Sequence, residues 1–299
     1  MSNVLLVDIG GTNIRYAVYD SGSPDIDNVH KTKFEIDVFD EMLKKIIDAN
    51  NVDQLVISAA GPKIENTISM TNKNFVLNSD VLRKKFNLKK CYLLNDWEAI
   101  AHSFDYVSKN IKFIKNGKKF NNQTLFLGPG TGLGAALLID NRIVVSTEIG
   151  NTVNTTQFLK KNFNFEIPEN LTLEEIISGT GISNLYKFKT GMTLTAEEIF
   201  IKYLDNEQDS LEVINGFIKC LAQTLCDLSL TFLPGNGILL AGSLMRSLYT
   251  YIDTKEFKEN FVGVKKGAHR EILDMISIGI ITKERTPLYG NLGFYNKFS

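Results

Sequence analysis

An aspartate stands at the end of the first apolar run, directly before a glycine-rich turn. Asp8 directly follows the apolar residues 4–7, and the turn comprises Gly10, Gly11, Thr12 and Asn13. Glycine N–H groups and a hydroxyl that no bulky side chain covers suit phosphate oxygens. A carboxylate beside them would repel phosphate unless a cation lay between, and Mg²⁺ prefers one or two carboxylates together with phosphate oxygens. The stretch predicts either a metal–nucleotide site or a strand-end aspartate that caps a tight turn.

A second glycine-rich turn lies in the middle of the chain. Residues 128–135 read GPGTGLGA and supply Gly130, Thr131 and Gly132 between two strand-like runs. The segment lacks the lysine of a P-loop and precedes a strand, so it fits neither a Walker nor a Rossmann fingerprint. Gly242, in the segment LAGSL, follows another buried run, where an adenine or ribose could lie against the backbone. Two glycine–threonine turns in one chain favour phosphate binding.

An Asn-Asp pair follows a further apolar run. Asn95 and Asp96 directly follow the run CYLL of residues 91–94 and precede a helical pattern. Ligands of open α/β sheets bind at the carboxyl ends of strands. An aspartate there can accept the proton of a substrate hydroxyl as it attacks phosphorus, and phosphoryl transfer asks little more than this, positioning and a metal. The alternative is that Asn95 or Asp96 only caps the helix.

The elements that must position these residues alternate between strands and helices. Apolar runs predict strands at residues 4–7, 14–19, 55–59 and 91–94, with a helix over residues 39–50. The second half repeats the pattern with a strand, a glycine turn and a strand over residues 125–139. Two helical segments follow, the longer over about residues 211–233, before a strand at GILL; Pro287 marks the start of a last helix. The basic run KFIKNGKK, residues 112–119, is expected to be a solvated loop.

The composition is ordinary for a globular chain. Of the 299 residues 43% are hydrophobic and 22% are charged, with a formal net charge of -1. This charge gives no electrostatic case for nucleic acid or an anionic membrane as a partner. We expect a cytoplasmic protein, because neither a signal-peptide pattern nor a run of about 20 apolar residues is seen. The spacing of Cys91, Cys220 and Cys226 suits neither a disulfide framework nor a zinc site.

Five motifs in order make the chain resemble the bacterial glucokinases of the hexokinase/actin-like ATPase superfamily. They are DIGGTN, LND, GPGTGLG, SGTGI and LAGSL, and the triplet MTN of residues 70–72 falls where that family carries it. The resemblance implies an α/β, two-domain actin-like ATPase (ribonuclease H-like) fold, with mixed sheets flanked by helices and a cleft between the domains. The expected small domain comprises residues 1–105 plus 288–299, and the large domain residues 106–287.

The resemblance also implies an activity and its residues. The activity is ATP-dependent phosphorylation of a hexose at its 6-hydroxyl, with glucose as the expected substrate, Mg²⁺ as the metal and a homodimer as the assembly. Asp96 matches the catalytic base. The positions that match sugar contacts are Asn95, Asp96, Glu148, Asn151 and Glu174.

The nucleotide contacts are implied in the same way. Asp8 matches the residue that holds the metal through water. The positions that match the two phosphate loops and the adenosine motif are Gly10, Gly11, Thr12, Asn13, Gly130, Thr131, Gly132 and Gly242.

Two residues depart from the family pattern, which reads Glu-Gly-Gly-His where this chain has Glu148-Ile149-Gly150-Asn151. Asn151 can still donate and accept, so sugar binding can survive with altered affinity or hexose preference. Ile149 adds a branched side chain where the backbone can need dihedrals that favour glycine. These changes leave two alternatives open: a non-catalytic sugar- or nucleotide-sensing relative, and a kinase for another hexose or an amino sugar.

A related family of repressors and sugar kinases is disfavoured. Its members carry a zinc-binding cysteine cluster shortly after a Glu-x-Gly-His motif, and no cysteine lies between Cys91 and Cys220. We also expect no DNA-binding domain before the first sheet, which begins at Val4.

Overall fold

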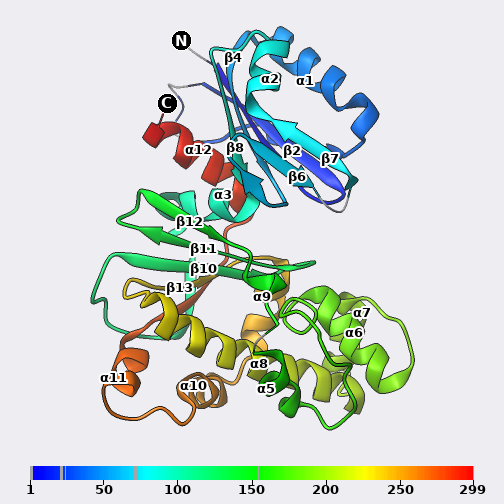
Figure 1. Ribbon diagram of the computed structural model, residues 1–299, viewed down its shortest axis with the longest axis vertical. Coiled ribbons are helices and arrows are strands. Elements are labelled where there is room, and N and C mark those ends of the chain that lie inside the picture. Colours follow the sequence, from blue (N-terminus) through cyan, green and yellow to red (C-terminus); the bar gives the residue numbers. More distant parts are fainter. Residues whose placement is uncertain (1–2, 21–22, 24, 71–72, 154, 299) are drawn as a thin grey trace. The chain divides into compact units, whose positions relative to one another are not determined.

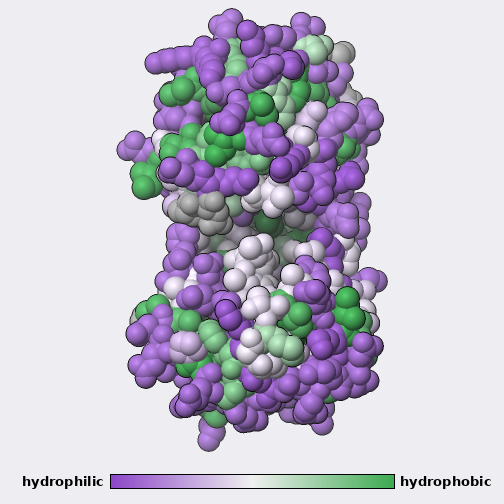
Figure 2. All heavy atoms as spheres, turned by 90° about the vertical axis from the view of Figure 1, so that its right-hand side faces the viewer, coloured by the Kyte–Doolittle hydropathy of each residue, from purple (hydrophilic) through white to green (hydrophobic). Residues whose placement is uncertain are grey.

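The computed structural model describes residues 3–20, 23, 25–70, 73–153 and 155–298. Thr71 and Asn72 of the MTN triplet therefore lie outside the described residues. The chain forms two compact units: Met1–Lys109 with Lys283–Ser299, and Asn110–Thr282. The C-terminal segment thus belongs to the first unit. On the face drawn in Figure 2, hydrophilic residues cover most of each unit and apolar residues are scattered among them.

In the described residues the first unit is built on a five-stranded mixed sheet with the order β3-β2-β1-β4-β8 (Figure 1). Its strands are β1 (Asn3–Ile9), β2 (Asn13–Asp20), β3 (His30–Lys33), β4 (Val52–Ala59) and β8 (Lys90–Asn95). β1 and β2 form an antiparallel hairpin, whereas β1, β4 and β8 run parallel. Ile9 pairs with Ala59 and Ala59 pairs with Asn95, so the three carboxyl ends meet at one edge of the sheet.

Helices cover both faces of this sheet, because successive side chains of its strands point alternately into two apolar clusters. Leu5 and Val7 pack with the buried residues of α1 (Ile36–Asn50) and α2 (Ser79–Lys85). Val4 and Leu6 pack with α3 (Asp96–His102) and α12 (Thr286–Phe298). The remaining elements are α4 (Phe104–Val107) and a small antiparallel sheet of β5 (Lys63–Ile64), β6 (Thr67–Met70) and β7 (Phe75–Asn78).

Two glycines let α12 lie directly on α3. A Cβ at Gly290 would lie 1.7 Å from the Ala99 carbonyl oxygen, and one at Gly293 would lie 2.2 Å from the His102 carbonyl oxygen. Any larger residue would push the helices apart. The C-terminal helix is therefore fixed against the helix that begins at Asp96.

The second unit contains a six-stranded mixed sheet in the described residues, with the order β12-β11-β10-β13-β14-β9. Its strands are β9 (Ile111–Lys115), β10 (Gln123–Pro129), β11 (Leu133–Ile139), β12 (Ile143–Thr147), β13 (Gly237–Leu240) and β14 (Ile278–Ile281). β10 and β11 form the second glycine hairpin, and β13 runs parallel to β10. The carboxyl ends of β10 and β13 consequently lie side by side.

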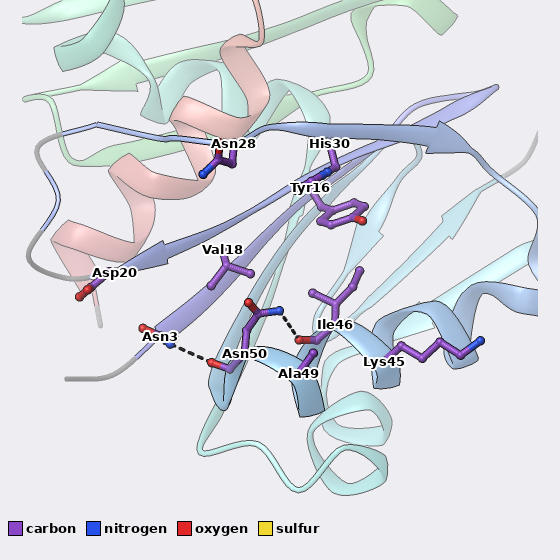
Figure 3. A pocket seen from close by; sticks show the side chains of 10 residues that line it. All are labelled: Asn3, Tyr16, Val18, Asp20, Asn28, His30, Lys45, Ile46, Ala49 and Asn50. Carbon is purple, nitrogen blue, oxygen red and sulfur yellow. Dashed lines mark hydrogen bonds between the residues drawn. The ribbon is translucent and has the colours of Figure 1, made fainter.

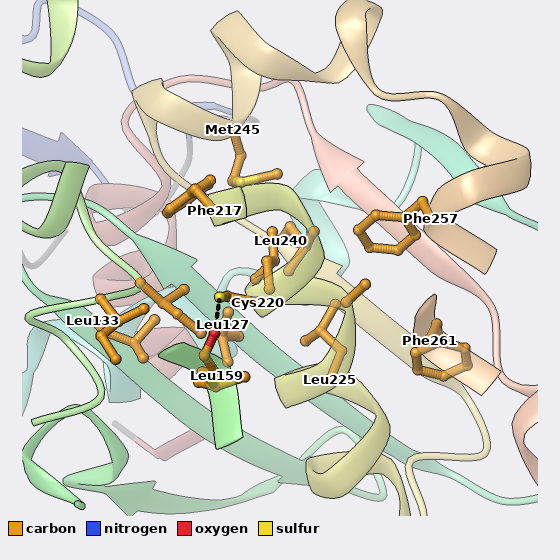
Figure 4. Close-up of a cluster of buried hydrophobic side chains, with 14 of the residues drawn as sticks. Leu127, Leu133, Leu159, Phe217, Cys220, Leu225, Leu240, Met245, Phe257 and Phe261 are labelled. Carbon is orange, nitrogen blue, oxygen red and sulfur yellow. Dashed lines mark hydrogen bonds between the residues drawn. The ribbon is translucent and has the colours of Figure 1, made fainter. Parts of the chain in front are cut away.

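A long helix forms the centre of this unit's core. α8 (Gln208–Phe232) places Phe217, Cys220 and Leu225 among residues of β10, β13 and the later helices (Figure 4). By length and composition α8 is the one helix of the described residues that could cross a membrane, but 67% of its apolar window is buried inside the unit. The other helices are α5 (Thr156–Leu159), α6 (Gly179–Thr190), α7 (Ala196–Leu204), α9 (Ser243–Leu248), α10 (Thr254–Val262) and α11 (Gly267–Met275), with the 3-10 turns η2 (Ile149–Asn151), η3 (Lys160–Asn162) and η4 (Tyr249–Tyr251).

The predicted strands at both glycine hairpins, the first helix, the long helix and the helix that begins near Pro287 are confirmed. The expectation of two helical segments before GILL is wrong, because α5, α6, α7 and α8 all lie between β12 and β13. α5 has only four residues, too few to produce a helical period in the sequence.

The prediction of a solvated loop over residues 112–119 is wrong in its first half. Residues up to Lys115 belong to β9, which pairs antiparallel with β14. Lys115 is only 5% exposed. The Lys115 Nζ donates to the carbonyl oxygens of Asp274 at 2.9 Å and Ile276 at 2.6 Å. Burial lowers the pKa of Lys115 to about 8. Its carbonyl partners are distant in sequence, so basic composition alone did not reveal them.

Candidate active site

Asp8 lies at the end of β1 as a buried carboxylate with a partner on each oxygen. It is 4% exposed. Its Oδ2 lies 3.2 Å from the Arg15 Nη1, and its Oδ1 lies 3.4 Å from the Ser58 hydroxyl. Burial raises the pKa of Asp8 above its usual range, while the charge and hydrogen bond of Arg15 and the hydrogen bond of Ser58 act to lower it. The two donors thus favour the ionised form.

The turn after Asp8 leaves its backbone open. The Gly10 N–H donates to the Asn13 carbonyl oxygen at 2.9 Å, which closes the turn. A Cβ at Gly11 would meet no atom of the described residues within 4 Å, and Gly11 and Thr12 are exposed. The Thr12 carbonyl oxygen accepts from the Phe34 N–H at 2.9 Å and so ties the turn to the body of the unit. The turn can therefore receive an anion at its exposed N–H groups.

Asn95 and Asp96 stand at the same sheet edge as Asp8, where β8 passes into α3. The Asn95 Oδ1 accepts from the N–H groups of Trp97 at 2.9 Å and Glu98 at 3.3 Å, and its Nδ2 donates to the Gly61 carbonyl oxygen at 2.9 Å. Asn95 therefore caps α3, as the alternative interpretation predicted, and only its second amide hydrogen remains for a ligand. The half-buried Asp96 occupies the first helical position, and its Oδ1 accepts from Trp97 N–H at 3.0 Å.

In the second unit, the turn between β10 and β11 lies against the start of α6. Gly130 N–H donates to the Gly132 carbonyl oxygen at 2.8 Å, and Gly179 N–H donates to the Gly130 carbonyl oxygen at 2.7 Å. Ser178 caps α6, because its Oγ accepts from Gly181 N–H at 2.9 Å. The free N–H groups and dipole of a helix N-terminus favour anions. Thr131 is exposed beside this helix end.

Gly242 follows β13 at the edge where β10 also ends. Its φ of +110° lies in the region that favours glycine. A Cβ there would lie 3.6 Å from the Pro129 carbonyl oxygen, so Gly242 lies close to the second glycine hairpin. Ala241 N–H donates to the Leu127 carbonyl oxygen at 2.9 Å and continues the pairing of the two strands.

Glu174 connects this hairpin to the segment that contains Glu148. Its Oε2 accepts from the Leu133 N–H at 3.3 Å, and its own N–H donates to the Gly150 carbonyl oxygen at 2.9 Å. A Cβ at Gly132 would lie 2.5 Å from this Oε2, and one at Gly150 would lie 3.3 Å from it. The carboxylate thus fills a space that two glycines leave open.

Glu148 precedes the short 3-10 turn η2, and Asn151 is the last residue of that turn. The Asn151 Nδ2 donates to the Glu148 Oε2 at 3.4 Å. Partial desolvation raises the pKa of the otherwise exposed Glu148; the Asn151 hydrogen bond lowers it, and the negative charge of Glu174 raises it. The structure therefore brings Glu148, Asn151 and Glu174 together beside the second glycine hairpin.

The expected strain at Ile149 is absent. Ile149 has no positive φ and packs against the core of the second unit. The glycine that the segment requires is Gly150, where a Cβ would lie 2.4 Å from the Leu133 carbonyl oxygen. Replacing the first glycine of the family pattern with Ile149 therefore costs no backbone strain here.

Sequence reasoning missed the residues that hold the predicted ones. Arg15, Ser58 and Ser178 were not singled out, yet they contact Asp8 or cap α6 at the second hairpin. Arg15 could have been found, because an antiparallel hairpin with its turn at Gly10 to Asn13 places Arg15 directly opposite Asp8. Ser58 lies on a strand that is not adjacent in sequence and left no such signal.

A hollow in the first unit lies elsewhere. It has a volume of about 540 Å³ between α1 and the start of the first hairpin, and its wall includes Asn3, Lys45 and the stacked rings of Tyr16 and His30 (Figure 3). Asn3 begins β1, whereas Asp8 lies near its end. The hollow is thus separate from the predicted site.

Comparison with known proteins identifies relatives along the whole chain. A family model described as Glucokinase matches residues 5–297. The glucokinase of Caulobacter vibrioides is 27% identical over 96% of this chain and 93% of its own length.

Two solved structures show the fold. The glucokinase from Balamuthia mandrillaris in complex with glucose has a TM-score of 0.81 at 19% identity, over 100% of this chain and 94% of that one. A ROK family glucokinase from Streptomyces griseus in complex with glucose and AMPPNP has a TM-score of 0.67 at 15% identity, over 97% and 98%. The expected actin-like ATPase fold is confirmed. Because the family model spans nearly the whole sequence, this chain belongs to the glucokinase family of ATP-dependent sugar kinases.

Proposed function

We propose that this enzyme transfers the γ-phosphoryl group of ATP to the 6-hydroxyl of glucose, with Asp96 as the general base. One observation carries the assignment: parallel strands align Ile9, Ala59 and Asn95, so Asp8, the open turn after it and Asp96 share one sheet edge. Asp96 accepts the proton of the hydroxyl, whose oxygen forms the bond to phosphorus as the bond to ADP breaks. Its place in the first turn of α3 stabilises the negative charge of Asp96 before the transfer.

The sugar contacts in this proposal combine acceptors and donors. Glu148 and Glu174 accept from ring hydroxyls, and Asn151 supplies an amide that can donate and accept. The Asn151 amide already lies 3.4 Å from Glu148, so it orients that carboxylate as well. Asn95 contributes its remaining amide hydrogen and holds the start of α3.

The nucleotide contacts lie on both glycine hairpins. The turn of Gly10, Gly11, Thr12 and Asn13 binds phosphate oxygens in the first unit, and the turn of Gly130, Thr131 and Gly132 does so in the second. The N–H groups of Gly10 and Gly130 close these turns, and the other residues supply the donors. Gly242 gives the adenosine room against the backbone. The open space at Gly11 and the helix end behind Gly130 support these roles.

The donor set suits Mg²⁺ held through water. The described residues hold no cluster of three His, Cys, Asp or Glu side chains that could enclose a metal. Asp8 presents one carboxylate whose oxygens already contact Arg15 and Ser58. Such a carboxylate orients metal-bound water, which is how Mg²⁺ commonly meets proteins. When bound, the ion neutralises developing charge on the phosphate oxygens.

We propose further that the enzyme works in the cytoplasm as a homodimer, without a nucleic acid or membrane partner. The net charge of -1 supports the absence of an electrostatic polyanion partner. Light scattering at several protein concentrations measures the assembly; a monomer at all of them contradicts the dimer.

The test is ADP release across a panel of hexoses and amino sugars, with wild type, Asp96→Asn and Asp80→Asn. Asp80 is also an acid in the first turn of a short helix of the first unit, but it bonds Asn66 at 3.0 Å. We expect glucose to give the highest kcat/KM, and Asp96→Asn to lower kcat by about 10²–10⁴-fold. Asp80→Asn should retain the wild-type rate. Saturable sugar binding without turnover in the wild type would instead indicate a sensor.

A further inference from the structure

Asn291, on the C-terminal helix α12, is a buried polar residue that contacts two neighbours of Asp8. Asn291 is completely buried on the face of α12 whose neighbours Leu288 and Leu292 are apolar. Its Nδ2 donates to the Val7 carbonyl oxygen at 2.8 Å and to the Ser58 Oγ at 3.1 Å. The close contact of Gly290 with Ala99 fixes the helix at this depth.

The orientation of the Asn291 amide follows from its partners. If the amide were reversed, its oxygen would face the Val7 carbonyl oxygen, and two acceptors would be opposed. As it stands, both Nδ2 hydrogens are used, and the Oδ1 is buried without a partner among the described residues. An unpartnered buried acceptor destabilises a fold. An apolar residue would avoid that cost but would leave the buried Val7 carbonyl oxygen and Ser58 hydroxyl without the hydrogen bonds from Nδ2.

The Asn291 amide determines which acceptor the Ser58 hydroxyl donates to. This hydroxyl accepts from Asn291 and has one proton to donate, with the Val7 carbonyl oxygen and the Asp8 Oδ1 both at 3.4 Å. The Val7 oxygen already accepts from Asn291, and a charged carboxylate is the stronger acceptor. The Ser58 proton therefore points at Asp8.

We propose that Asn291 is a positioning residue for the phosphate site, and that it acts on Asp8 through Ser58. The inference rests on the proposed role of Asp8 beside the metal–nucleotide complex. Ser58 holds the Oδ1 while Arg15 holds the Oδ2, so the carboxylate has one orientation toward the sheet edge. Residues that orient a group beside a metal commonly change metal affinity by about 10- to 100-fold when removed.

The experiment measures ADP binding by calorimetry, once with Mg²⁺ and once with EDTA. The ratio of the two affinities is the metal-dependent gain. The variants are Asn291→Leu, Ser58→Ala, their double variant and Asp8→Asn. Asn296→Ala is the matched control, because Asn296 lies on the same helix and donates to the Tyr106 hydroxyl at 2.8 Å, away from Asp8. Urea unfolding of each variant separates loss of stability from loss of the gain.

We expect Asn291→Leu and Ser58→Ala each to lower the gain by about 10-fold or more. The double variant should lose no more than the stronger single variant, since both act on one pathway. Asn296→Ala should keep the full gain. The inference is overturned if either Asn291→Leu or Ser58→Ala stays within about twofold of wild type while Asp8→Asn loses the gain; this result leaves the proposed function intact.

Other outcomes are equally decisive. Multiplied losses in the double variant show that Asn291 acts independently of Ser58, which overturns the relay. If Asp8→Asn keeps the full gain, the metal role of Asp8 fails, and the positioning role fails with it. If Asn291→Leu does not fold, Asn291→Ala takes its place, because it also removes the hydrogen bond to Ser58.

Discussion

The Glu174 carboxylate accepts a hydrogen bond from the Leu133 N–H at 3.3 Å, across 41 residues of sequence. Leu133 begins β11 directly after the second glycine turn. The Glu174 N–H meanwhile donates to the Gly150 carbonyl oxygen in the segment that carries Glu148. One residue therefore contacts both the proposed phosphate turn and the proposed sugar segment.

Replacing Glu174 should affect both substrates. Glu174→Ala removes the acceptor of the Leu133 N–H, so we expect the KM for ATP to rise by about 10-fold as well as the KM for glucose. Glu174→Gln keeps an acceptor oxygen, so its main effect should be on glucose. Initial rates with each substrate varied separately measure both constants. Glu175→Ala is the control, because Glu175 bonds the N–H and hydroxyl of Thr172 and should change only stability. An unchanged KM for ATP in Glu174→Ala contradicts the link.

Gly11→Ala tests whether the first turn holds phosphate. The added methyl meets no described atom within 4 Å, and Gly11 is not among the glycines with positive φ, so the free energy of unfolding should stay within about 0.5 kcal/mol of wild type. A bound phosphate would occupy that space, so kcat/KM for ATP should fall by about 100-fold. Thermal unfolding and steady-state kinetics give the two readouts. Normal kinetics in a normally stable variant would show that phosphate does not approach Gly11.

The pH dependence of glucose use should reflect Glu148. Its carboxyl group accepts from sugar hydroxyls most strongly when ionised. Desolvation raises its pKa above 4.5, so kcat/KM should begin to fall at a higher pH than it would with an ordinary glutamate. Asn151→Ala removes a hydrogen bond that lowers this pKa, so the acid limb should move to higher pH. Glu174→Gln removes a charge that raises the pKa, so the limb should move to lower pH. Shifts of the same sign in both variants contradict the assignment to Glu148.

His102 should make the first unit sensitive to acid. Burial, together with the charges of Lys297 and Lys63, lowers the pKa of His102 to about 4, against 6.5 for the unfolded chain. As pH falls from 6.5 to 4, the unfolded state binds the proton on His102 first. The free energy of unfolding therefore decreases over that window. At about 1.4 kcal/mol per pKa unit, the loss is about 3 kcal/mol. His102→Leu should remove this slope in urea unfolding at a series of pH values; an unchanged slope assigns the acid sensitivity to other groups.

Local patterns were enough to predict the parts of the site that lie close in sequence. The glycine turns, the strand-end position of Asp8 and the start of α3 at Asp96 follow from apolar runs, turn residues and capping residues. The hairpin register even implies the Asp8–Arg15 pair, since a turn of known length sets which residues face each other. Capping by Asn95 was one of two open interpretations of the sequence, and the structure shows the capping contacts.

Local sequence patterns are enough to place residues in turns and at strand ends, because those features depend on a few neighbouring residues. Which distant groups meet there depends on how separate segments of the folded chain pack. Glu174 contacts Leu133, Asn291 contacts Ser58 and Lys115 contacts two carbonyl oxygens at the end of α11, across 41 to 233 residues. These contacts depend on the close packing of helices and sheets, where a missing Cβ at Gly132 or Gly290 makes room for a neighbour. No local period encodes such a fit, because it arises only when separate segments are packed together.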